Sequence, residues 1–121
     1  MAAAIVNLDV EQGATFSKLM TWYQEDGISV IDMTGCTAKS QWRTSVDDPT
    51  VLMELSTENG RISIDVPKGQ IKIHLTKDET AALTFTSCVY DLEVFFSEVS
   101  GETYSYRLCR GKVKLSKSIT R

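Results

Sequence analysis

The sequence has little with which to build a catalytic site, because its 121 residues include one histidine. Acyl-transfer enzymes hold a nucleophile against a base, and that base is most often histidine. His74 lies between Ile73 and Leu75, at an outward-facing position of an expected strand, which is typical of a surface residue. No Gly-x-Ser-x-Gly motif occurs either. The sequence therefore predicts that the protein is not an enzyme.

Cysteine is also scarce. Cys36, Cys88 and Cys109 are odd in number and far apart, and no Cys-x-x-Cys pair occurs. This spacing argues against a disulfide framework and a zinc site, so we expect free thiols. The seven glycines are scattered singly, which argues against a phosphate-binding loop. We expect no cofactor and no metal.

Two acidic pairs are the remaining candidates for chemistry. Asp91 and Glu93 share the outward face of an expected strand, but a glycosidase pair would also need a sugar-binding cleft. Asp47 and Asp48 lie in an expected loop, and no second acidic cluster accompanies them, as a calcium site would need. We interpret all four as solvated residues.

Long apolar runs are absent, so the sequence predicts no membrane-spanning segment. Residues 1–6 carry no basic region and are followed by Asn7 and Asp9, which argues against a secretory signal. We therefore expect a protein that folds in the cytoplasm and has no membrane partner. The net charge of −3 gives no general attraction to nucleic acid.

The charges are unevenly distributed along the chain. Before Thr50 there are seven acidic residues and three basic ones, whereas after Glu102 every charged residue is basic. Lysines on edge strands can simply block unwanted strand pairing. Alternatively, opposed acidic and basic surfaces dock neighbouring copies, with Arg107, Lys112 and Lys114 as the basic interface candidates.

Short segments of alternating polar and apolar residues are abundant. The clearest are residues 36–43, 62–66, 71–75 and 89–96. Trp42 is the expected core anchor, and Thr76 with Glu79 matches a capping box for one short helix near residues 76–83. The spacing predicts an all-β fold: one antiparallel β-sandwich of about eight or nine short strands, forming a single domain over residues 1–121.

The turns predict how some strands pair. A hairpin is expected to join a first strand over residues 5–10 to a second over residues 16–22. A turn at residues 100–102 leads into an expected strand over residues 104–108. Gly111 then separates that strand from the last one.

Exposed aromatic residues are further candidates for a protein interface. Adjacent aromatics cannot both point inward on a regular strand, so Trp22 or Tyr23 is expected at the surface. Phe95 and Cys109 fall on outward-facing positions, where a second chain would bury them. The aromatics that share the parity of aliphatic neighbours are expected in the core: Trp42, Tyr90, Tyr104 and Tyr106.

Several short motifs occur in an order that resembles one family. They lie at residues 11–16, Trp22, residues 33–35, 57–60, 79–83, 90–93 and 111–113, and include Gln-Gly-Ala-Thr, Glu-Thr-Ala-Ala-Leu and Tyr-Asp-Leu-Glu. Together they resemble small virion proteins of tailed phages and prophages, similar to the N-terminal domain of phage baseplate upper proteins. The resemblance implies an immunoglobulin-like β-sandwich with no catalytic residues. The chain departs from the family pattern at Cys36, where an aromatic residue is common.

The resemblance also implies a role: a structural protein located in a tailed-phage virion. We expect multiple copies in the tail, baseplate or neck, forming a ring, collar or fibre-attachment adaptor with other virion proteins. A capsid decoration protein is an alternative in the same class, and the sequence does not separate the two. A carbohydrate-binding module with an exposed aromatic platform is the alternative from a different class.

Overall fold

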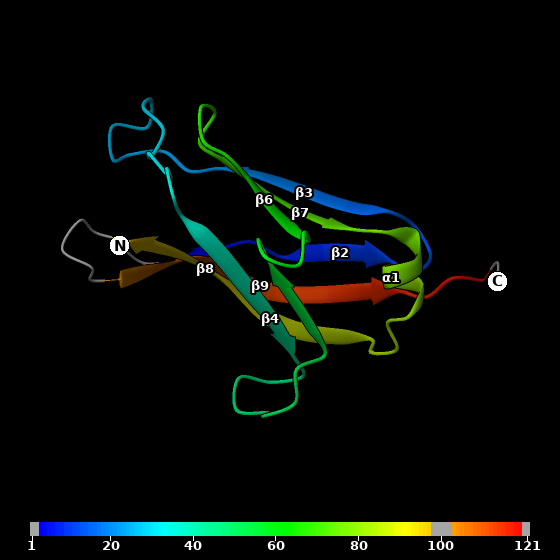
Figure 1. Ribbon diagram of the computed structural model, residues 1–121. Coiled ribbons are helices and arrows are strands. Elements are labelled where there is room, and N and C mark those ends of the chain that lie inside the picture. The colour runs from blue at the N-terminus through cyan, green and yellow to red at the C-terminus, as the bar shows by residue number, and fades with distance from the viewer. Residues whose placement is uncertain (1–2, 98–102, 120–121) are drawn as a thin grey trace.

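The computed structural model describes residues 3–97 and 103–119, and most of them form strands in two facing sheets (Figure 1). Strand accounts for 53% of the described residues and helix for 5%, which confirms the predicted all-β fold. The elements are β1 (Ala4–Ile5), β2 (Leu8–Glu11), β3 (Phe16–Thr21), β4 (Thr37–Arg43), β5 (Met53–Ser56), β6 (Ile62–Asp65), β7 (Gln70–Leu75), α1 (Lys77–Ala81), β8 (Ser87–Ser97) and β9 (Thr103–Ser116). The turn expected at residues 100–102 lies outside the described residues.

The larger sheet has the order β1-β9-β8-β4-β5, and β2 also pairs with β9. The smaller sheet has the order β3-β7-β6. The strand pairs within the described residues are antiparallel except that β1 and β2 run parallel to β9. Residues 4–11, which we call the N-terminal segment, therefore lie beside β9, the last strand of the chain.

The predicted hairpin between the first two strands is wrong, because β2 belongs to the larger sheet and β3 to the smaller one. Each strand has an apolar face, and the change of sheet lets the two faces cover the core from opposite sides. Thr80 of α1 holds in place the connection that carries the chain from β2 in one sheet to β3 in the other. Its Oγ1 accepts a hydrogen bond from Gly13 N at 3.0 Å and donates one to Ala14 O at 2.9 Å.

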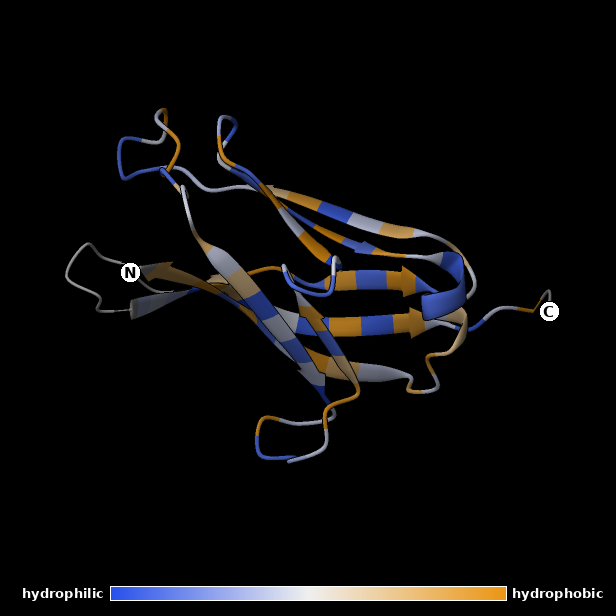
Figure 2. Cartoon of the chain, in the orientation of Figure 1, coloured by the Kyte–Doolittle hydropathy of each residue, from blue (hydrophilic) through white to orange (hydrophobic). Residues whose placement is uncertain are grey.

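The core fills the space between the sheets, and Figure 2 shows how polar and apolar residues alternate along the strands that enclose it. Trp42 is fully buried, as predicted, and its ring packs edge-on against Phe85 at 6.3 Å. β6 and β7 form an antiparallel hairpin, with Ile62 opposite Ile73 on its apolar face. Burial of large side chains from both sheets supplies the main driving force for folding.

The capping box at α1 forms as predicted. Thr76 Oγ1 accepts a hydrogen bond from Glu79 N at 3.2 Å, and the Glu79 carboxylate accepts one from Thr76 N at 2.9 Å. Arg61 Nε forms an ion pair with the same carboxylate, and Arg61 Nη1 donates to Glu54 O at 2.9 Å. Arg61 thereby joins the helix to β5.

The free edge of β5 is occupied by side chains of the following turn. Asn59 Nδ2 donates to Glu54 O at 3.0 Å, and Asn59 Oδ1 accepts from Ser56 N at 3.0 Å. Unpaired backbone groups at a sheet edge are a template for pairing with another chain. These hydrogen bonds therefore make β5 a poor site for strand addition.

The two strands predicted on either side of Gly111 are one continuous strand, β9. A bulge interrupts its register against β8: Leu92 pairs with Cys109 and Glu93 pairs with Arg107, which leaves Leu108 without an opposite residue. The parity of the strand reverses at this point. Cys109 consequently points into the core and is 1% exposed, so its predicted outward position is wrong.

Gly111 lies under the N-terminal segment rather than in a turn. A Cβ atom at this position would stand 2.3 Å from Val6 O, which is closer than van der Waals contact allows. Tyr90 Oη donates to the same carbonyl at 2.6 Å, and Lys112 N donates to Asn7 Oδ1 at 3.0 Å. The absence of a side chain at residue 111 therefore allows the segment between β1 and β2 to run close beside β9.

We predict that Gly111→Ala lowers the free energy of unfolding by about 1–3 kcal/mol, because the added methyl group overlaps the backbone at Val6. Tyr90→Phe removes the hydrogen bond to Val6 O and the contact of Tyr90 Oη with Cys109 Sγ, and it should cost about 1 kcal/mol. Urea denaturation measures both. The control Ser105→Ala, on the exposed face of β9, should stay within about 0.5 kcal/mol of the wild type. A Gly111→Ala protein as stable as that control would contradict this account of the N-terminal segment.

Candidate interaction surfaces

The described residues contain no group of three or more His, Cys, Asp or Glu side chains placed to hold a metal ion. His74 lies on the outer face of β7, where its Nδ1 is 3.0 Å from Ser17 Oγ. No hydrogen bond to a carboxylate orients this ring in the part of the chain that the structure describes. A serine–histidine pair without an orienting acid lacks the third member of a catalytic triad.

The three thiols are free, as predicted, and none is activated. Burial raises the pKa of the Cys88 thiol to about 12. Burial also raises the pKa of Cys109, whose Sγ lies 3.6 Å from Tyr90 Oη and 3.7 Å from Met20 Sδ. The pKa of the half-buried Cys36 is raised by burial and by the nearby negative charge of Asp32. Because the thiolate is the reactive form, the raised pKa values lower the reactivity of these thiols at neutral pH.

We predict that Cys88 makes stability fall as the pH rises above about 9. The unfolded thiol loses its proton there, whereas the folded thiol keeps it up to about pH 12, so alkaline pH favours the unfolded state. Urea denaturation at intervals between about pH 8 and pH 10.5 measures the slope of stability against pH. In Cys88→Ala this slope should be shallower at every point above pH 9, whatever the packing cost of the substitution. Equal slopes in the two proteins would contradict the buried, protonated thiol.

Four aromatic rings meet at one end of the sandwich, where β8 and β9 extend beyond the core. Trp22 packs edge-on against Phe96 at 5.9 Å and against Tyr106 at 6.2 Å, and Phe96 stacks on Tyr104 at 5.6 Å. Tyr104 and Tyr106 lie opposite Phe96 and Val94 of β8, but they are 40% and 45% exposed, so their predicted position in the core is wrong. We call these rings, together with the neighbouring Tyr23, the aromatic end.

The structure resolves which member of the predicted aromatic pair is exposed. Tyr23 is 47% exposed, whereas Trp22 is 7% exposed and belongs to the core, so Trp22 is not a surface residue. Phe95 lies on the outer face of the larger sheet between Thr37 and Ser105 and is half-buried. Cys109, being buried, offers no surface to a second chain.

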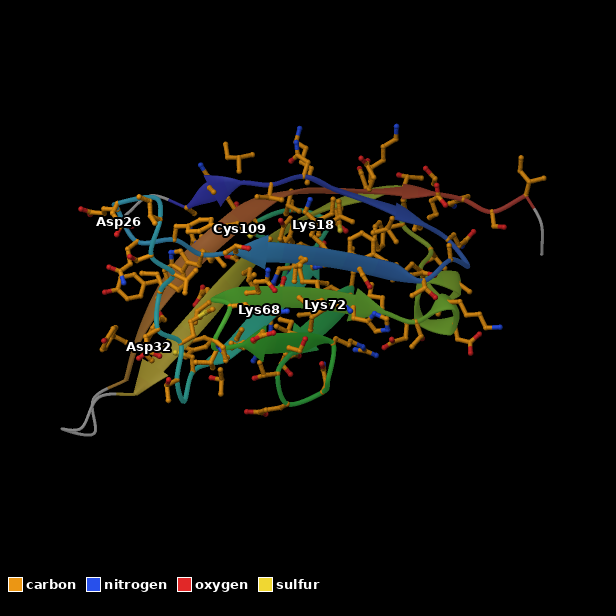
Figure 3. All side chains as sticks on the ribbon, turned by 90° about the horizontal axis from the view of Figure 1, so that it is seen from above. Lys18, Asp26, Asp32, Lys68, Lys72 and Cys109 are labelled. Atoms are coloured by element: carbon orange, nitrogen blue, oxygen red, sulfur yellow. The ribbon has the colours of Figure 1, made fainter. Side chains whose placement is uncertain are left out.

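An acidic loop, residues 24–32, lies at the same end of the molecule between β3 and β4 (Figure 3). Its sequence carries Glu25, Asp26 and Asp32 and no basic residue. Asp26 forms a turn in this loop: its carboxylate accepts hydrogen bonds from Ile28 N at 2.8 Å and Ser29 N at 2.9 Å. These bonds hold the pKa of Asp26 below its usual value. Ile28 at the tip is 83% exposed.

A shallow groove of about 680 Å³ crosses the outer face of the larger sheet, over β4, β8 and β9. Four cations and two carboxylates line it: Arg43, Arg107, Arg110, Lys112, Asp91 and Glu93. Arg107 pairs with Asp91 at 3.3 Å, while Arg110 and Lys112 form no ion pair with a described residue. We call this surface the basic groove.

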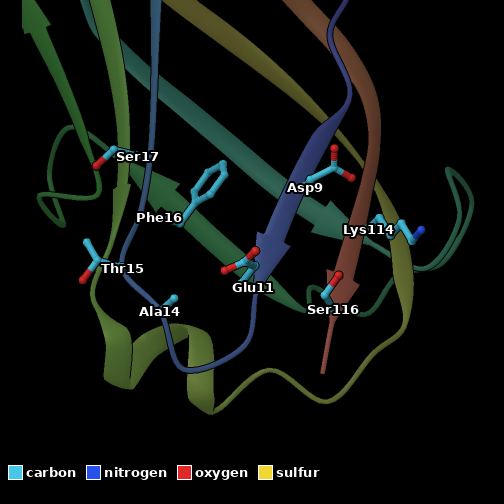
Figure 4. A pocket seen from close by; sticks show the side chains of 8 residues that line it. All are labelled: Asp9, Glu11, Ala14, Thr15, Phe16, Ser17, Lys114 and Ser116. Atoms are coloured by element: carbon cyan, nitrogen blue, oxygen red, sulfur yellow. The ribbon is translucent and has the colours of Figure 1, made fainter. Parts of the chain in front are cut away.

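The charge asymmetry of the sequence does not produce separate acidic and basic faces. Strand pairing sets the cations of β9 beside acids: Lys114 lies opposite Asp9 of β2, and Arg107 lies opposite Glu93 of β8. Lys114 lines a second, smaller pocket of about 340 Å³ with Asp9 and Glu11 (Figure 4). Carboxylates beside Lys114 compensate its charge, so it is the weakest of the predicted basic interface residues.

Sequence reasoning missed two features of these surfaces. It did not single out Ile28, although an isoleucine directly after Asp-Gly in an acidic stretch is a signal of an exposed apolar tip. It also missed Arg43, which only the pairing of β4 with β8 brings next to the cations of β9. No protein-family model and no curated protein matches the chain.

Proposed function

We propose that this protein is a non-enzymatic structural protein of a tailed-phage virion that assembles in multiple copies in the tail, baseplate or neck. The observation that carries the proposal is the aromatic end. Tyr106 packs on the buried Trp22, and Tyr23 and Tyr104 are exposed beside it; such clusters of exposed aromatics are typical of surfaces that become buried in protein interfaces. A ring, collar or fibre-attachment adaptor would use such a surface to contact neighbouring virion proteins.

The strand order supports the immunoglobulin-like part of the proposal. β4, β8 and β9 share one sheet, and β3, β7 and β6 share the other. Strands C, F and G and strands B, E and D of immunoglobulin domains are divided in the same way. β5 then takes the place of the additional strand C′ of variable-type domains. The N-terminal segment beside β9 completes the larger sheet.

Fractionation of purified particles tests the proposal. Heads and tails are separated, and peptides of this chain are quantified by mass spectrometry against the major capsid and tube proteins. The proposal predicts enrichment with tails at a small copy number. Enrichment with heads near capsid stoichiometry would instead indicate a capsid decoration protein. Absence from both fractions would overturn the virion role.

We predict that the double substitution Tyr23→Ser and Tyr104→Ser reduces incorporation into particles by tenfold or more, roughly the loss expected when interface anchors are truncated. Both rings are exposed, so the purified variant should stay folded. Leu19→Ser is the matched control, because Leu19 is 55% exposed on the outer face of the smaller sheet, away from the aromatic end. Equal incorporation of the double variant and the control would contradict an interface at the aromatic end.

A carbohydrate-binding module is the second candidate, and the exposed rings of Tyr23 and Tyr104 favour it. Sugar rings stack on exposed aromatic faces, so this function would place glycans on the aromatic end. A broad glycan array with the purified protein distinguishes the two candidates. Binding that disappears in the Tyr23→Ser and Tyr104→Ser variant would support carbohydrate recognition. No binding to the array would reject it.

A further inference from the structure

The basic groove has an excess of positive charge that the chain itself does not neutralise. Its four cations and two carboxylates leave a net charge of +2. The Arg43 guanidinium donates to Gln41 Oε1 at 2.7 Å and to Asp48 O at 2.8 Å, which are neutral acceptors. The groove also has an apolar component, because Ile5 and Val46 along its rim are 70% and 84% exposed. Its occupant should therefore be acidic and carry an exposed apolar side chain.

The acidic loop has this chemistry. It carries three carboxylates, no cation and the exposed Ile28 at its tip. Its conformation is already fixed: Gln24 N donates to Ser29 O at 2.7 Å, and Ile31 N donates to Trp22 O at 2.9 Å. At its base Val30 packs against Gly69, where a Cβ atom would lie 2.3 Å from Val30 Cβ. A loop ordered before binding loses less conformational entropy when it docks.

The loop and the groove are placed so that they join different copies. The loop precedes the first residue of β4, whereas Arg43, the last residue of that strand, lines the groove. The intervening strand is about 20 Å long. Figure 1 shows the loop at the end of the sandwich where β4 begins. Contact between two different surfaces of identical chains is heterologous and generates closed rings or open filaments.

We propose that the acidic loop of one copy docks in the basic groove of the next copy, so that the chains associate head to tail. Glu25 of the loop faces Arg110 and Lys112 of the groove, and Ile28 packs between Ile5 and Val46. The inference rests on the proposed function, because it names the partner through which the copies of a ring or collar contact each other. The self-complementary charges favour a second copy over other acidic partners.

Charge exchange tests the proposal. Sedimentation velocity measures self-association of the purified chain from about 10 μM to about 1 mM, a range that reveals weak contacts. Glu25→Lys and Arg110→Glu should each weaken association roughly tenfold, because each places like charges together. Neither side chain is buried, so both variants should stay folded. Raising the ionic strength from about 0.05 M to about 0.5 M should also weaken the wild-type association.

An equimolar mixture of the two single variants provides the decisive measurement. The intact loop of the Arg110→Glu chain meets the intact groove of the Glu25→Lys chain, and the two altered surfaces again have opposite charges. Association should therefore recover in the mixture and in the chain that carries both substitutions. Ile28→Ser should also weaken association. Mixing the Ile28→Ser chain with a chain that carries both Ile28→Ser and Arg110→Glu should not restore association, because neither chain then has a wild-type loop.

Two matched controls reverse charges elsewhere on exposed residues: Glu58→Lys in the turn after β5 and Lys72→Glu on β7. Neither should change the association. A contact between two grooves would instead respond to Arg110→Glu and not to Glu25→Lys, which would overturn the proposal. A chain that stays monomeric at about 1 mM would overturn it as well. That result would leave the virion role intact, because particle fractionation detects incorporation through other proteins.

Discussion

The structure depends on one irregularity, the bulge at Leu108 in β9. Even-numbered residues face inward before the bulge and odd-numbered residues face inward after it. The extra residue therefore lets the apolar side chains of both parts of β9 point to the same side of the sheet. Without it, Val113 and Leu115 would face solvent whenever Tyr104 and Tyr106 faced the core. The bulge also sets Arg107, Arg110 and Lys112 on one outer face. The bulge therefore determines both which residues of β9 enter the core and which of its cations line the basic groove.

The N-terminal segment couples this strand to the rest of the sandwich. It runs close beside β9 at Gly111, which has no side chain, and Tyr90 Oη of β8 donates a hydrogen bond to Val6 O in its backbone. Ile5 and Asn7 from the same segment line the groove. Loss of the segment would therefore remove part of a candidate interaction surface as well as one edge of the larger sheet. The charged side chains around it contribute little to stability because they are exposed.

The sequence predicted those features that depend on local patterns. Alternation located β4, β6, β7 and β8, and the Thr76–Glu79 pair located α1. The sequence-based prediction failed where distant contacts decide how strands pair. The connection from β2 to β3 at Gly13 depends on Thr80, and the inward position of Cys109 depends on its register against β8. Exposure of Tyr23 rather than Trp22 was left open because parity alone does not say which face is inside. The groove was beyond prediction, since it brings together three strands.

Contacts between the surface of this protein and neighbouring chains are the basis of the function proposed for it. Zero-length cross-linking of lysines to carboxylates in intact particles tests this claim most directly. Lys39 and Glu54, 3.2 Å apart within one chain, provide an internal reference. We predict a link between Lys112 of one copy and Glu25 of another, because Lys112 is aligned with the end of β4 and Glu25 precedes its start, about 20 Å away along the strand. Particles that give the Lys39–Glu54 link and no link from this chain to any second chain would contradict it.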